Sequence, residues 1–590
     1  MSKTPQTIGG QARRRWSSRA SGAAAASRLR PWWHGYGRRD AAHDLVAGIV
    51  TCAVLAPQAL GYAFLAGLPP QVGLYAALLP PLLYAVLGTS RALAVGPVAV
   101  ASILSGAVLS TVVQDPSQLL PAAAMLALLS GTVMLALGVL RAGVLVNFIS
   151  FPVLNGFTAG AGVLIVVSQL YNLLGIAAPR GQRGVELIVA IVEAAPQTRF
   201  VALSFSLGVF AALLAGRRFI EPVLCRLGLR RILAAGAALV WPLFVLIGAG
   251  LAGRYLGLGL ALVGPIPPGL PQLALPRLDW ALTRALLPGA LLVAVVSYLE
   301  SVAIGRVLAR LRRMRTDANR ELIAVGAANL AAALSLGMPV AGSFTRSTVA
   351  DAAGARSPAA GVVTAAGLAA SILLFGDALR WVPKAALAAI IIFAVARLVD
   401  LRSLRRTWEY DRGEAAAWLA TAAASFMVGV EQGLLLGVAL ALLLHVWRSS
   451  QPHMAEVGLV PRTEQFRELD RHPELEIWPQ LLLVRLDESL FFGNVARFED
   501  FITARLSLRP QVTDLILICS AVNAVDASGI ETLEQLAETL ATAGITLHLA
   551  DLSGPIRDRL ENTELLRQLG AGRVHPSTAG AIAALAAPPI

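Results

Sequence analysis

Long apolar stretches separated by short, arginine-containing polar loops dominate residues 44–450. A helix that crosses a bilayer needs about 20 mainly apolar residues, and roughly fourteen windows here meet that length or nearly meet it with a glycine or proline interruption. These windows lie at 44–61, 71–88, 93–113, 119–139, 144–174, 198–216, 231–252, 284–308, 319–337, 344–355, 358–375, 383–399, 414–430 and 432–447. The pattern predicts an α-helical, multi-pass membrane domain.

The third window is interrupted by Gly96 and Pro97. The residues before Gly96 suit an extended segment, and Pro97 suits the first turn of a helix, where its missing N–H would have no partner anyway. We therefore expect a half-helix that starts in the middle of the membrane. Its unpaired N–H groups and the positive end of its dipole would face whatever lies opposite.

The tenth window is preceded by a second interruption at 338–347, which contains a proline, a glycine, three hydroxyl residues and an arginine. Gly342 relieves the backbone and Ser343 can cap a helix start. The helix expected at 345–355 is too short to cross a bilayer. Arg346 would either face a cavity beside Phe344 and Thr345 or extend its side chain to the membrane interface.

Irregular backbone at membrane depth persists only where it is buried in protein or lines a cavity. Two broken helices at corresponding positions of two halves are typical of transporters built from inverted repeats, with substrate bound between the half-helix N-termini. Such N-termini favour anions. We interpret both interruptions as walls of one anion site.

Two further polar residues lie inside predicted spans. Gln58 follows Pro57 in the first span and faces either a cavity or a neighbouring helix. Glu300 lies in the eighth span, and an ionisable side chain in a span suggests a functional site. Beside an anion site, a carboxylate could take up the H⁺ or Na⁺ that is carried with the substrate. The alternative is an ion pair with Arg306 at the membrane interface.

Composition supports this class of protein. Hydrophobic residues make up 56% of the chain and charged residues 14%, whereas charged residues are about a quarter of an average soluble protein. The net charge of +13 need not indicate nucleic acid, because the arginines lie between apolar segments. They are concentrated in alternate loops, as the positive-inside rule requires of cytoplasmic loops. Both termini are therefore expected in the cytoplasm.

The sequence contains few other chemical signals. Residues 1–43 are rich in Arg, Ser and Ala and are expected to form a largely disordered cytoplasmic tail, with a transit peptide or twin-arginine signal as the alternative. Cys52, Cys225 and Cys519 fit neither a disulfide framework nor a metal site. The histidines show no metal-ligand spacing, and no nucleotide-binding or nucleophile motif is present, so neither a metal nor an enzyme is expected.

The composition changes at Glu456 to that of a soluble α/β domain, which we place at 456–590. Apolar runs at 481–486 and 514–519 predict buried strands, and 531–540 predicts an amphipathic helix. The segment 524–529 lies between strand and helix, where Asp526 or Ser528 would cap the helix.

Several segments together resemble the sulfate permease (SulP) family of anion transporters, namely 61–76, 88–100, 300–306, 342–347 and 353–355. The resemblance covers the whole membrane part. The plant-type members usually have Gly-Ser-Phe-Ser-Arg-Ser where this chain has Thr345 as the fourth residue. The resemblance implies fourteen spans in a 7+7 inverted repeat, elevator-like movement of a core against a gate, and a dimer. It also places the anion near the backbone amides of Val98, Phe344 and Thr345, and Glu300 at the acidic position of cation-coupled members.

The C-terminal domain resembles the STAS domain of sulfate transporters and anti-sigma-factor antagonists, and 490–494 fits the transporter version. This resemblance implies that the domain binds a regulatory protein or a nucleotide. Ala527 stands where antagonists carry the first of two hydroxyl residues, which puts a phosphorylation switch in doubt.

We expect a multi-pass transporter of the inner (plasma) membrane that carries an inorganic anion, sulfate with protons, and uses no cofactor besides the co-transported cation. Within transport, the alternative is a Na⁺-coupled bicarbonate carrier or a dicarboxylate carrier of the same fold. From another class, the alternative is a membrane-anchored regulatory or scaffold protein whose STAS domain carries the activity.

Overall fold

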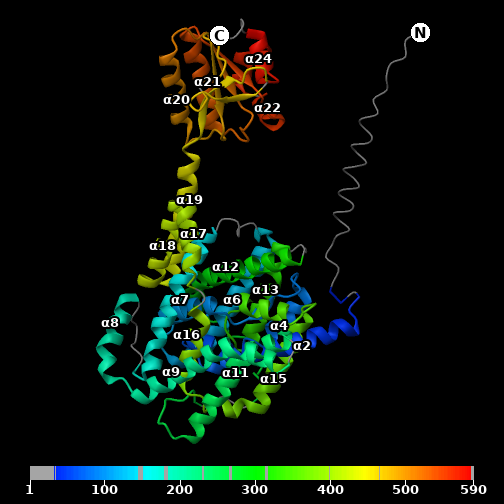
Figure 1. Ribbon diagram of the computed structural model, residues 1–590, viewed down its shortest axis with the longest axis vertical. Helices are drawn as coiled ribbons and strands as arrows, with labels where there is room; N and C mark the ends of the chain where they lie inside the picture. Colours follow the sequence, from blue (N-terminus) through cyan, green and yellow to red (C-terminus); the bar gives the residue numbers. More distant parts are fainter. Residues whose placement is uncertain are drawn as a thin grey trace, which may run out of the picture. The chain divides into compact units, whose positions relative to one another are not determined.

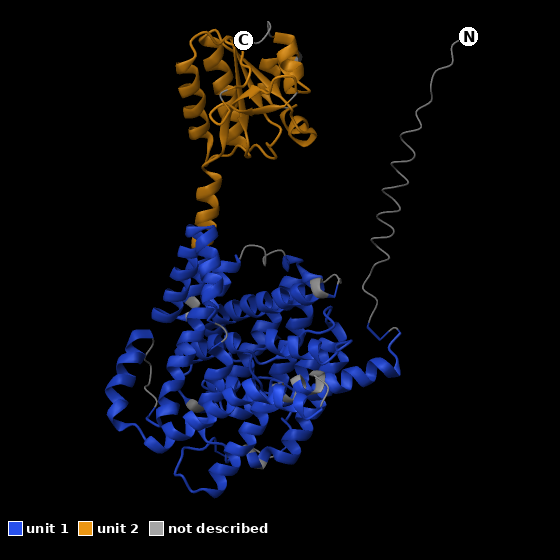
Figure 2. Cartoon of the chain, in the orientation of Figure 1, with its two compact units in different colours: residues 1–439 blue, residues 440–590 orange. Residues whose placement is uncertain are grey.

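The protein comprises two compact units, residues 1–439 and 440–590, as Figures 1 and 2 show. The computed structural model describes residues 32–33, 35–143, 150–177, 184–228, 231–264, 269–312, 317–396, 399–463, 465–472, 474–561 and 563–585. Most of the predicted N-terminal tail, residues 1–31, lies outside them. So do several arginines of the predicted loops: Arg230, Arg313, Arg315 and Arg397 in the loops expected to be cytoplasmic, and Arg180 and Arg183, which are exceptions in an opposite loop.

Every predicted span contains a helix. The helices of the first unit are α2 (Arg38–Leu65), α3 (Pro70–Tyr75), α4 (Leu79–Leu87), α5 (Ala99–Val112), α6 (Leu119–Val139), α7 (Phe151–Leu174), α8 (Gly184–Ala194), α9 (Phe200–Ala215), α10 (Glu221–Arg226), α11 (Arg231–Tyr255), α12 (Trp280–Leu311), α13 (Ala318–Leu334), α14 (Phe344–Ala352), α15 (Ala359–Leu379), α16 (Lys384–Val395), α17 (Leu401–Tyr410) and α18 (Arg412–Met427). α19 (Val430–Ser449) crosses the unit boundary. Two short strands, β1 (Ala94–Gly96) and β2 (Ala341–Ser343), interrupt this helical unit.

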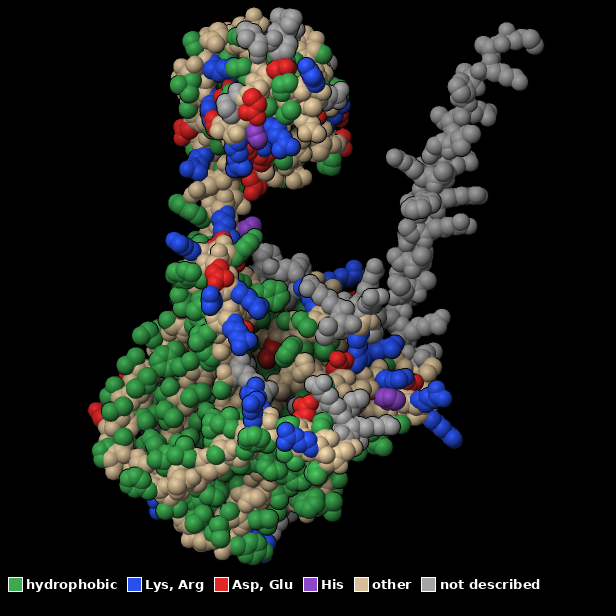
Figure 3. All heavy atoms as spheres, in the orientation of Figure 1, with side chains coloured by type: hydrophobic (Ala, Val, Ile, Leu, Met, Phe, Trp, Pro, Cys, Tyr) green, Lys and Arg blue, Asp and Glu red, His purple; other side chains and the backbone are tan. Residues whose placement is uncertain are grey.

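The helices have the length and surface of membrane spans. Among the described residues, eight helical segments are long and apolar enough to cross a bilayer, and α5, α16 and the second half of α11 are shorter apolar helices. Large hydrophobic side chains are exposed, including Phe200, Leu278 and Leu374. Figure 3 shows hydrophobic side chains spread over this face of the unit. A surface of this kind is stable against lipid and not in water, so the protein is a multi-pass membrane protein.

Three helices fall outside the predicted windows, and the shortest of them is α10, with six residues. α8 has only 11 residues, and α17 carries Arg402, Arg405 and Arg406, which make it too polar to be a span. Asp400 caps α17, since its side chain accepts hydrogen bonds from the backbone N–H groups of Arg402 and Ser403. None of the side chains of α17 is buried. A search for long apolar windows does not detect helices of this length and polarity.

The helices of the membrane unit form two sets, which contact each other where α2 packs against α11 and α16. One group, which we call the core, contains α2–α6 and α12–α15; in it, α6 packs against α12 and α13, and α2 against α15. The other, which we call the gate, contains α7–α11 and α16–α19; in it, α7 packs against α16 and α18, and α9 against α16. Both broken spans belong to the core.

The second unit contains β3 (Met454–Leu459), β4 (Phe466–Glu468), β5 (Leu481–Leu486), β6 (Asp514–Ile518), β7 (Thr546–Ala550) and β8 (Val574–His575), with α20 (Val495–Leu508), α21 (Ala527–Thr542), α22 (Gly554–Leu560), α23 (Glu564–Leu569) and α24 (Thr578–Leu585). The strands form one sheet in the order β4-β3-β5-β6-β7-β8. The pairs from β5 to β8 are parallel, whereas β3 pairs antiparallel with both β4 and β5.

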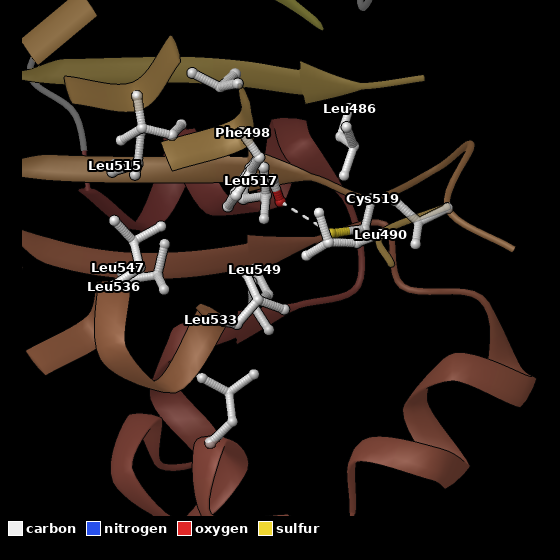
Figure 4. Packing of buried hydrophobic residues seen from close by; sticks show 14 of the residues in the cluster. Leu486, Leu490, Phe498, Leu515, Leu517, Cys519, Leu533, Leu536, Leu547 and Leu549 are labelled. Carbon is white, nitrogen blue, oxygen red and sulfur yellow. Dashed lines mark hydrogen bonds between the residues drawn. The ribbon is translucent and has the colours of Figure 1, made fainter. Parts of the chain in front are cut away.

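Successive side chains of a strand point to opposite faces of the sheet, so this sheet has a hydrophobic cluster on each face. Leu515 and Leu517 pack in one cluster and Ile516 and Ile518 in the other. Figure 4 shows the larger cluster, in which the Cys519 thiol donates to the carbonyl oxygen of Leu517 over 3.7 Å. Burial raises the pKa of Cys519 to about 12, so this thiol stays protonated at neutral pH. Covered on both faces, the sheet matches the predicted α/β domain.

Candidate functional site

A short antiparallel ladder joins the two broken spans. β1 pairs with β2 in the register Ala94 to Ser343, Val95 to Gly342 and Gly96 to Ala341. The ladder satisfies backbone groups that would otherwise be unpaired at membrane depth. It therefore brings together the two interruptions that the sequence assigns to one site.

Three polar side chains hold the ladder in place. The Ser301 hydroxyl accepts from Gly342 N at 2.8 Å, and the Ser347 hydroxyl accepts from Ala94 N at 2.9 Å. The Asn329 amide makes two hydrogen bonds of 2.9 Å with the backbone of Val340, one in each direction. Ser347 lies in the predicted segment 338–347, whereas Ser301 and Asn329 were not predicted as site residues. Small polar side chains in the predicted spans next to each interruption were the only available signal.

Both half-helices begin at the ladder. The N-cap of α5 is Val98, which is extended, buried and without a side-chain cap. The predicted place of Pro97 in the first helical turn is wrong, since α5 begins at Ala99; Gly96 is still paired in the ladder, so the helix starts two residues later than expected. The first N–H groups of α5 therefore have neither an intrahelical acceptor nor a side-chain cap.

The N-terminus of α14 is capped by Ser343, whose hydroxyl accepts from Arg346 N at 3.4 Å. Phe344 and Thr345, the first two residues of the helix, are both exposed, and the exposed fraction of Phe344 is 53%. The helix begins one residue earlier and ends three residues earlier than predicted. Its first two N–H groups lie in an accessible part of the core.

The Arg346 side chain is fully buried, with an exposed fraction of 0%, so it does not extend to the membrane interface. Its Nη1 donates to the carbonyl oxygen of Pro97 at 2.7 Å and to Oε1 of Gln58 at 3.3 Å. Its Nη2 lies beside Gly96, where an added Cβ would be 3.3 Å away. The guanidinium thus extends from the tenth span to the residues just before α5, the half-helix of the third span.

The first span supplies Gln58 and a residue that sequence reasoning missed. Tyr62 follows Gln58 by four residues on α2, so the two side chains share one helix face. Tyr62 is 9% exposed, and its hydroxyl lies within range of a charge interaction with Arg346. The i, i+4 spacing of an amide and a phenol in an apolar span was the signal available. Gln58 and Tyr62 thus form a third side of the site.

Glu300 lies on α12 within range of a charge interaction with Arg346, and its Oε2 is buried with no hydrogen-bond partner among the described residues. Arg306 is exposed and six residues further along the same helix. At 3.6 residues per turn the two side chains leave the helix about 120° apart, which disfavours the alternative pairing. Glu300 is thus the carboxylate whose charge acts on Arg346.

A second buried carboxylate, Glu321, positions the segment before β1. Its Oε2 accepts from Thr89 Oγ1 at 2.6 Å and from Thr89 N at 3.2 Å, and its Oε1 accepts from the Tyr84 hydroxyl. Glu321 is 1% exposed. It therefore fixes the end of α4 and the loop before β1 against α13.

The comparison with known families agrees with this architecture. The profile described as the Sulfate permease family matches residues 42–421, which is more than half of the chain. The chain belongs to the sulfate permease family. A family of permeases consists of transporters and not of enzymes. A second profile, the STAS domain, matches residues 472–581.

Individual relatives of this chain support the same family. It is 34% identical over 551 residues to a "Probable sulfate transporter 4.2" of Arabidopsis thaliana, covering 91% of this chain and 79% of that protein. It is 32% identical over 545 residues to a probable sulfate transporter of Mycobacterium tuberculosis, covering 91% and 94%. It has the fold of the murine Solute Carrier 26 family member A9 anion transporter in the inward-facing state, with a TM-score of 0.84, 23% identity and coverage of 94% and 92%.

In the STAS domain of this permease, Asp526 is the N-cap of α21. Its Oδ1 accepts from Gly529 N at 2.8 Å and its Oδ2 from Phe492 N at 3.0 Å. Of the two capping candidates, the structure selects Asp526, because Ser528 lies inside the helix. Ala527 is exposed at the first helical position. Asp526 therefore ties the 490–494 loop to the helix start.

One group of residues in the described part of the permease has the spacing of metal ligands: His453, Glu468 and Asp487. Arg485 already bonds both carboxylates, at 2.6 Å to Asp487 Oδ1 and 3.4 Å to Glu468 Oε1. Although burial opposes it, the hydrogen bonds from Arg485 and His453 hold the pKa of Asp487 below its usual value. The carboxylate charge is thus balanced by arginine, and the group is better explained as an ion-pair network.

Proposed function

We propose that this protein is a secondary active transporter that carries sulfate together with protons. The observation that carries the proposal is the burial of the Arg346 guanidinium between the N-terminal ends of two half-helices. The family and the fold establish a membrane transporter, and the printed names of the relatives support sulfate as the anion. The substrate would lie between Val98 and the pair Phe344 and Thr345.

The proposed site has the chemistry that an oxyanion needs. Unpaired N–H groups at two helix N-termini supply hydrogen bonds and partial positive charge. Arg346 adds a full charge in a place shielded from water, where charge interactions are stronger than at a surface. The Gln58 amide and Tyr62 hydroxyl supply further donors. Phe344 would close the site on its exposed side.

The proton would be carried by Glu300. While ionised, its carboxylate offsets the charge of Arg346 and repels an incoming anion. When protonated, it leaves the positive field of Arg346 for the substrate. Binding of a proton and binding of sulfate would then favour each other, as thermodynamic linkage requires of coupled ligands.

The movement would be that of the core relative to the gate. The β1–β2 ladder joins the two broken spans, and all the residues proposed for the site lie in the core. A core that moves as one body would carry the anion across the membrane by an elevator-like movement. We further propose that the protein lies in the inner membrane with both termini in the cytoplasm, because the arginine-rich loops alternate along the chain. We also propose a homodimer, as the family resemblance implies.

The test is uptake into proteoliposomes. Labelled sulfate should accumulate under an imposed pH gradient, inside alkaline, and a Na⁺ gradient of equal size should not replace it. Labelled bicarbonate and succinate in parallel vesicles test the alternative substrates. Sulfate uptake that ignores the pH gradient contradicts proton symport, and uptake of bicarbonate driven by Na⁺ supports the alternative carrier.

The regulatory or scaffold alternative makes the opposite prediction about two parts of the chain. It requires that function survive Arg346→Ala and be lost when residues after Glu456 are removed. The burial of Arg346 between the half-helices supports the transporter, since a scaffold has no need of a buried guanidinium at that depth. Transport assays of the two variants side by side decide between the classes.

A further inference from the structure

Helix α17 of the gate has an amphipathic surface that the proposed transport mechanism does not use. The helix packs against α7 and α18, as Figure 1 shows for α18. The Asn155 amide, near the start of α7, donates to the Ser403 hydroxyl of α17 at 2.9 Å, and only Asp411 separates α17 from the start of α18. Because α7 and α18 belong to predicted spans and both begin beside α17, this helix lies at a membrane surface.

One face of α17 is apolar and largely uncovered. Leu401, Leu404 and Trp408 follow one another at spacings of three and four residues, so they share one face of the helix. Leu401 is 65% exposed and Trp408 is 49% exposed, whereas Leu404 is half-buried beside Ser403 and Thr407, on the side that packs against the protein. Tryptophan is enriched where a membrane meets water. The exposed part of this face therefore suits contact with lipid.

Two exposed arginines lie on the flank of the apolar face. Arg405 leaves the helix about 60° from Trp408, and Arg402 precedes it by three residues, so the two side chains are neighbours on the helix surface. The Arg402 guanidinium has no ion-pair partner among the described residues. Arg405 Nε pairs with Glu409 Oε1 at 2.9 Å, but both side chains are exposed, by 83% and 62%. Such a pair contributes little to stability, so another anion can replace Glu409.

The remaining charges of α17 point elsewhere. Asp400 and Asp411 cap the starts of α17 and α18, where they accept hydrogen bonds from backbone N–H groups. Arg406 leaves the helix about 160° from Trp408 and therefore faces away from the apolar side. A helix with Trp and Leu on one face and arginines beside that face lies in the plane of the membrane interface and is attracted to anionic lipids.

We propose that α17 lies in the headgroup layer and binds the phosphate of an anionic phospholipid through Arg402 and Arg405, with Leu401 and Trp408 against the acyl chains. A headgroup without a cation of its own suits this flank, because an ammonium group would compete with the arginines for the phosphate. The lipid would anchor the gate at the membrane surface. The proposal depends on the exposed face and the charges of α17, and not on which anion the protein carries.

The test is quenching of Trp408 fluorescence by brominated lipids in the full-length protein. The protein is reconstituted in phosphatidylcholine vesicles that contain a smaller share of phosphatidylglycerol, with bromine on the acyl chains of one lipid at a time. The Trp408 signal is the difference between each protein and its own Trp408→Phe version. Phosphatidylglycerol should quench this signal more than its share of the lipid predicts.

The substitutions should change this preference in opposite directions. Arg405→Gln should lower the preference for phosphatidylglycerol about 5-fold, as expected for one arginine near an anionic surface, and Arg402→Gln should lower it too. Glu409→Gln removes the competing carboxylate and should raise it. Arg406→Gln is the matched control, because it removes the same charge from the far side of the same helix, and its preference should equal that of the wild type.

Several results would overturn the proposal. If neither lipid quenches Trp408, a protein surface and not lipid covers α17. Equal quenching by the two lipids, or an equal loss of preference in Arg406→Gln, would exclude a specific headgroup contact on this flank. Inorganic phosphate added at constant ionic strength should leave the preference unchanged, and its loss would assign the arginines to free phosphate. None of these results bears on whether sulfate is transported.

Discussion

The Arg346 side chain donates from Nη1 to the carbonyl oxygen of Pro97 at 2.7 Å, so one arginine of the tenth span contacts the backbone just before α5, the half-helix of the third span. The guanidinium therefore has two roles that can be separated. It supplies positive charge, and its fixed planar shape spaces the two broken spans. A lysine keeps the charge but lacks the planar set of donors.

Arg346→Lys should retain sulfate transport with a KM about 10-fold higher or more, the change expected when a charge-assisted hydrogen bond of roughly 1.5–3 kcal/mol is lost. Arg346→Ala should lose more, because the charge is lost too. Initial uptake rates in proteoliposomes across sulfate concentrations give the KM. Arg406→Lys on the exposed side of α17 is the control. Equal KM values for wild type and Arg346→Lys would mean that the spacing role is absent.

Glu300→Gln should abolish accumulation driven by a pH gradient and retain sulfate–sulfate exchange. The amide imitates the protonated carboxyl, so the site keeps its affinity for the anion but cannot release a proton. Counterflow and gradient-driven uptake, measured on the same vesicles, distinguish the two activities. Accumulation of sulfate by Glu300→Gln under a pH gradient would assign the coupling to another group.

Ser301→Ala should weaken the ladder. It removes the acceptor of the Gly342 N–H, and leaving a buried donor unsatisfied costs about 1–3 kcal/mol. The expected result is a lower melting temperature together with a lower maximal rate of sulfate uptake. Ser105→Ala is a matched control, because the buried Ser105 hydroxyl donates to Ala101 O of its own helix and does not contact the ladder. A Ser301→Ala protein as stable and active as this control would show that the ladder needs no support from α12.

The STAS domain should lose stability as the pH falls below about 6.5, the usual value for histidine. Burial lowers the pKa of His548, although the hydrogen bond that its Nε2 donates to Asp514 Oδ1 opposes the shift. The unfolded domain therefore binds more protons than the folded one in this range, and stability rises with pH until both forms are neutral. His548 also contacts His575 Nε2 at 3.1 Å across the pair β7 and β8.

Hydrogen exchange of the β7 and β8 amides in the full-length protein, compared at pH 7.5 and 5.5, measures this effect. Exchange should be faster at the lower pH after correction for the intrinsic rate. The dependence should be smaller in His548→Gln and unchanged in His472→Gln, an exposed histidine. Equal protection of wild type at both pH values would exclude a role for this pair.

The sequence predicted the site best where it places polar or helix-breaking residues inside an apolar membrane span. Gly96, Pro97 and the polar segment at 338–347 stand out because lipid excludes such residues unless backbone or cavity requires them. The fourteen spans followed from length and hydropathy for the same reason. Two of the ladder's supports, Ser301 and Asn329, were not detectable, because a small polar side chain in a span is common and its partner here is a backbone group of another segment.

Arg346 shows the limit most clearly. Its presence near the site was predicted. The residues that it bonds depend on how the third and tenth spans pack against each other, and a single sequence does not determine that packing. Pro97 was placed in the first turn of the helix, but it lies two residues before the first residue of α5, because Gly96 is still paired in the ladder. α17 was missed because its arginines resemble those of a loop.

The burial of Arg346 in the core also bears on membrane voltage. If the core moves with Glu300 protonated and sulfate bound, it carries one net negative charge across, since the arginine cancels half of the charge of the dianion. The empty core, with Glu300 ionised, carries none. A single charge crossing 100 mV corresponds to about 2.3 kcal/mol. A potential that is negative inside should therefore slow the inward step of the loaded protein and leave its empty return unaffected.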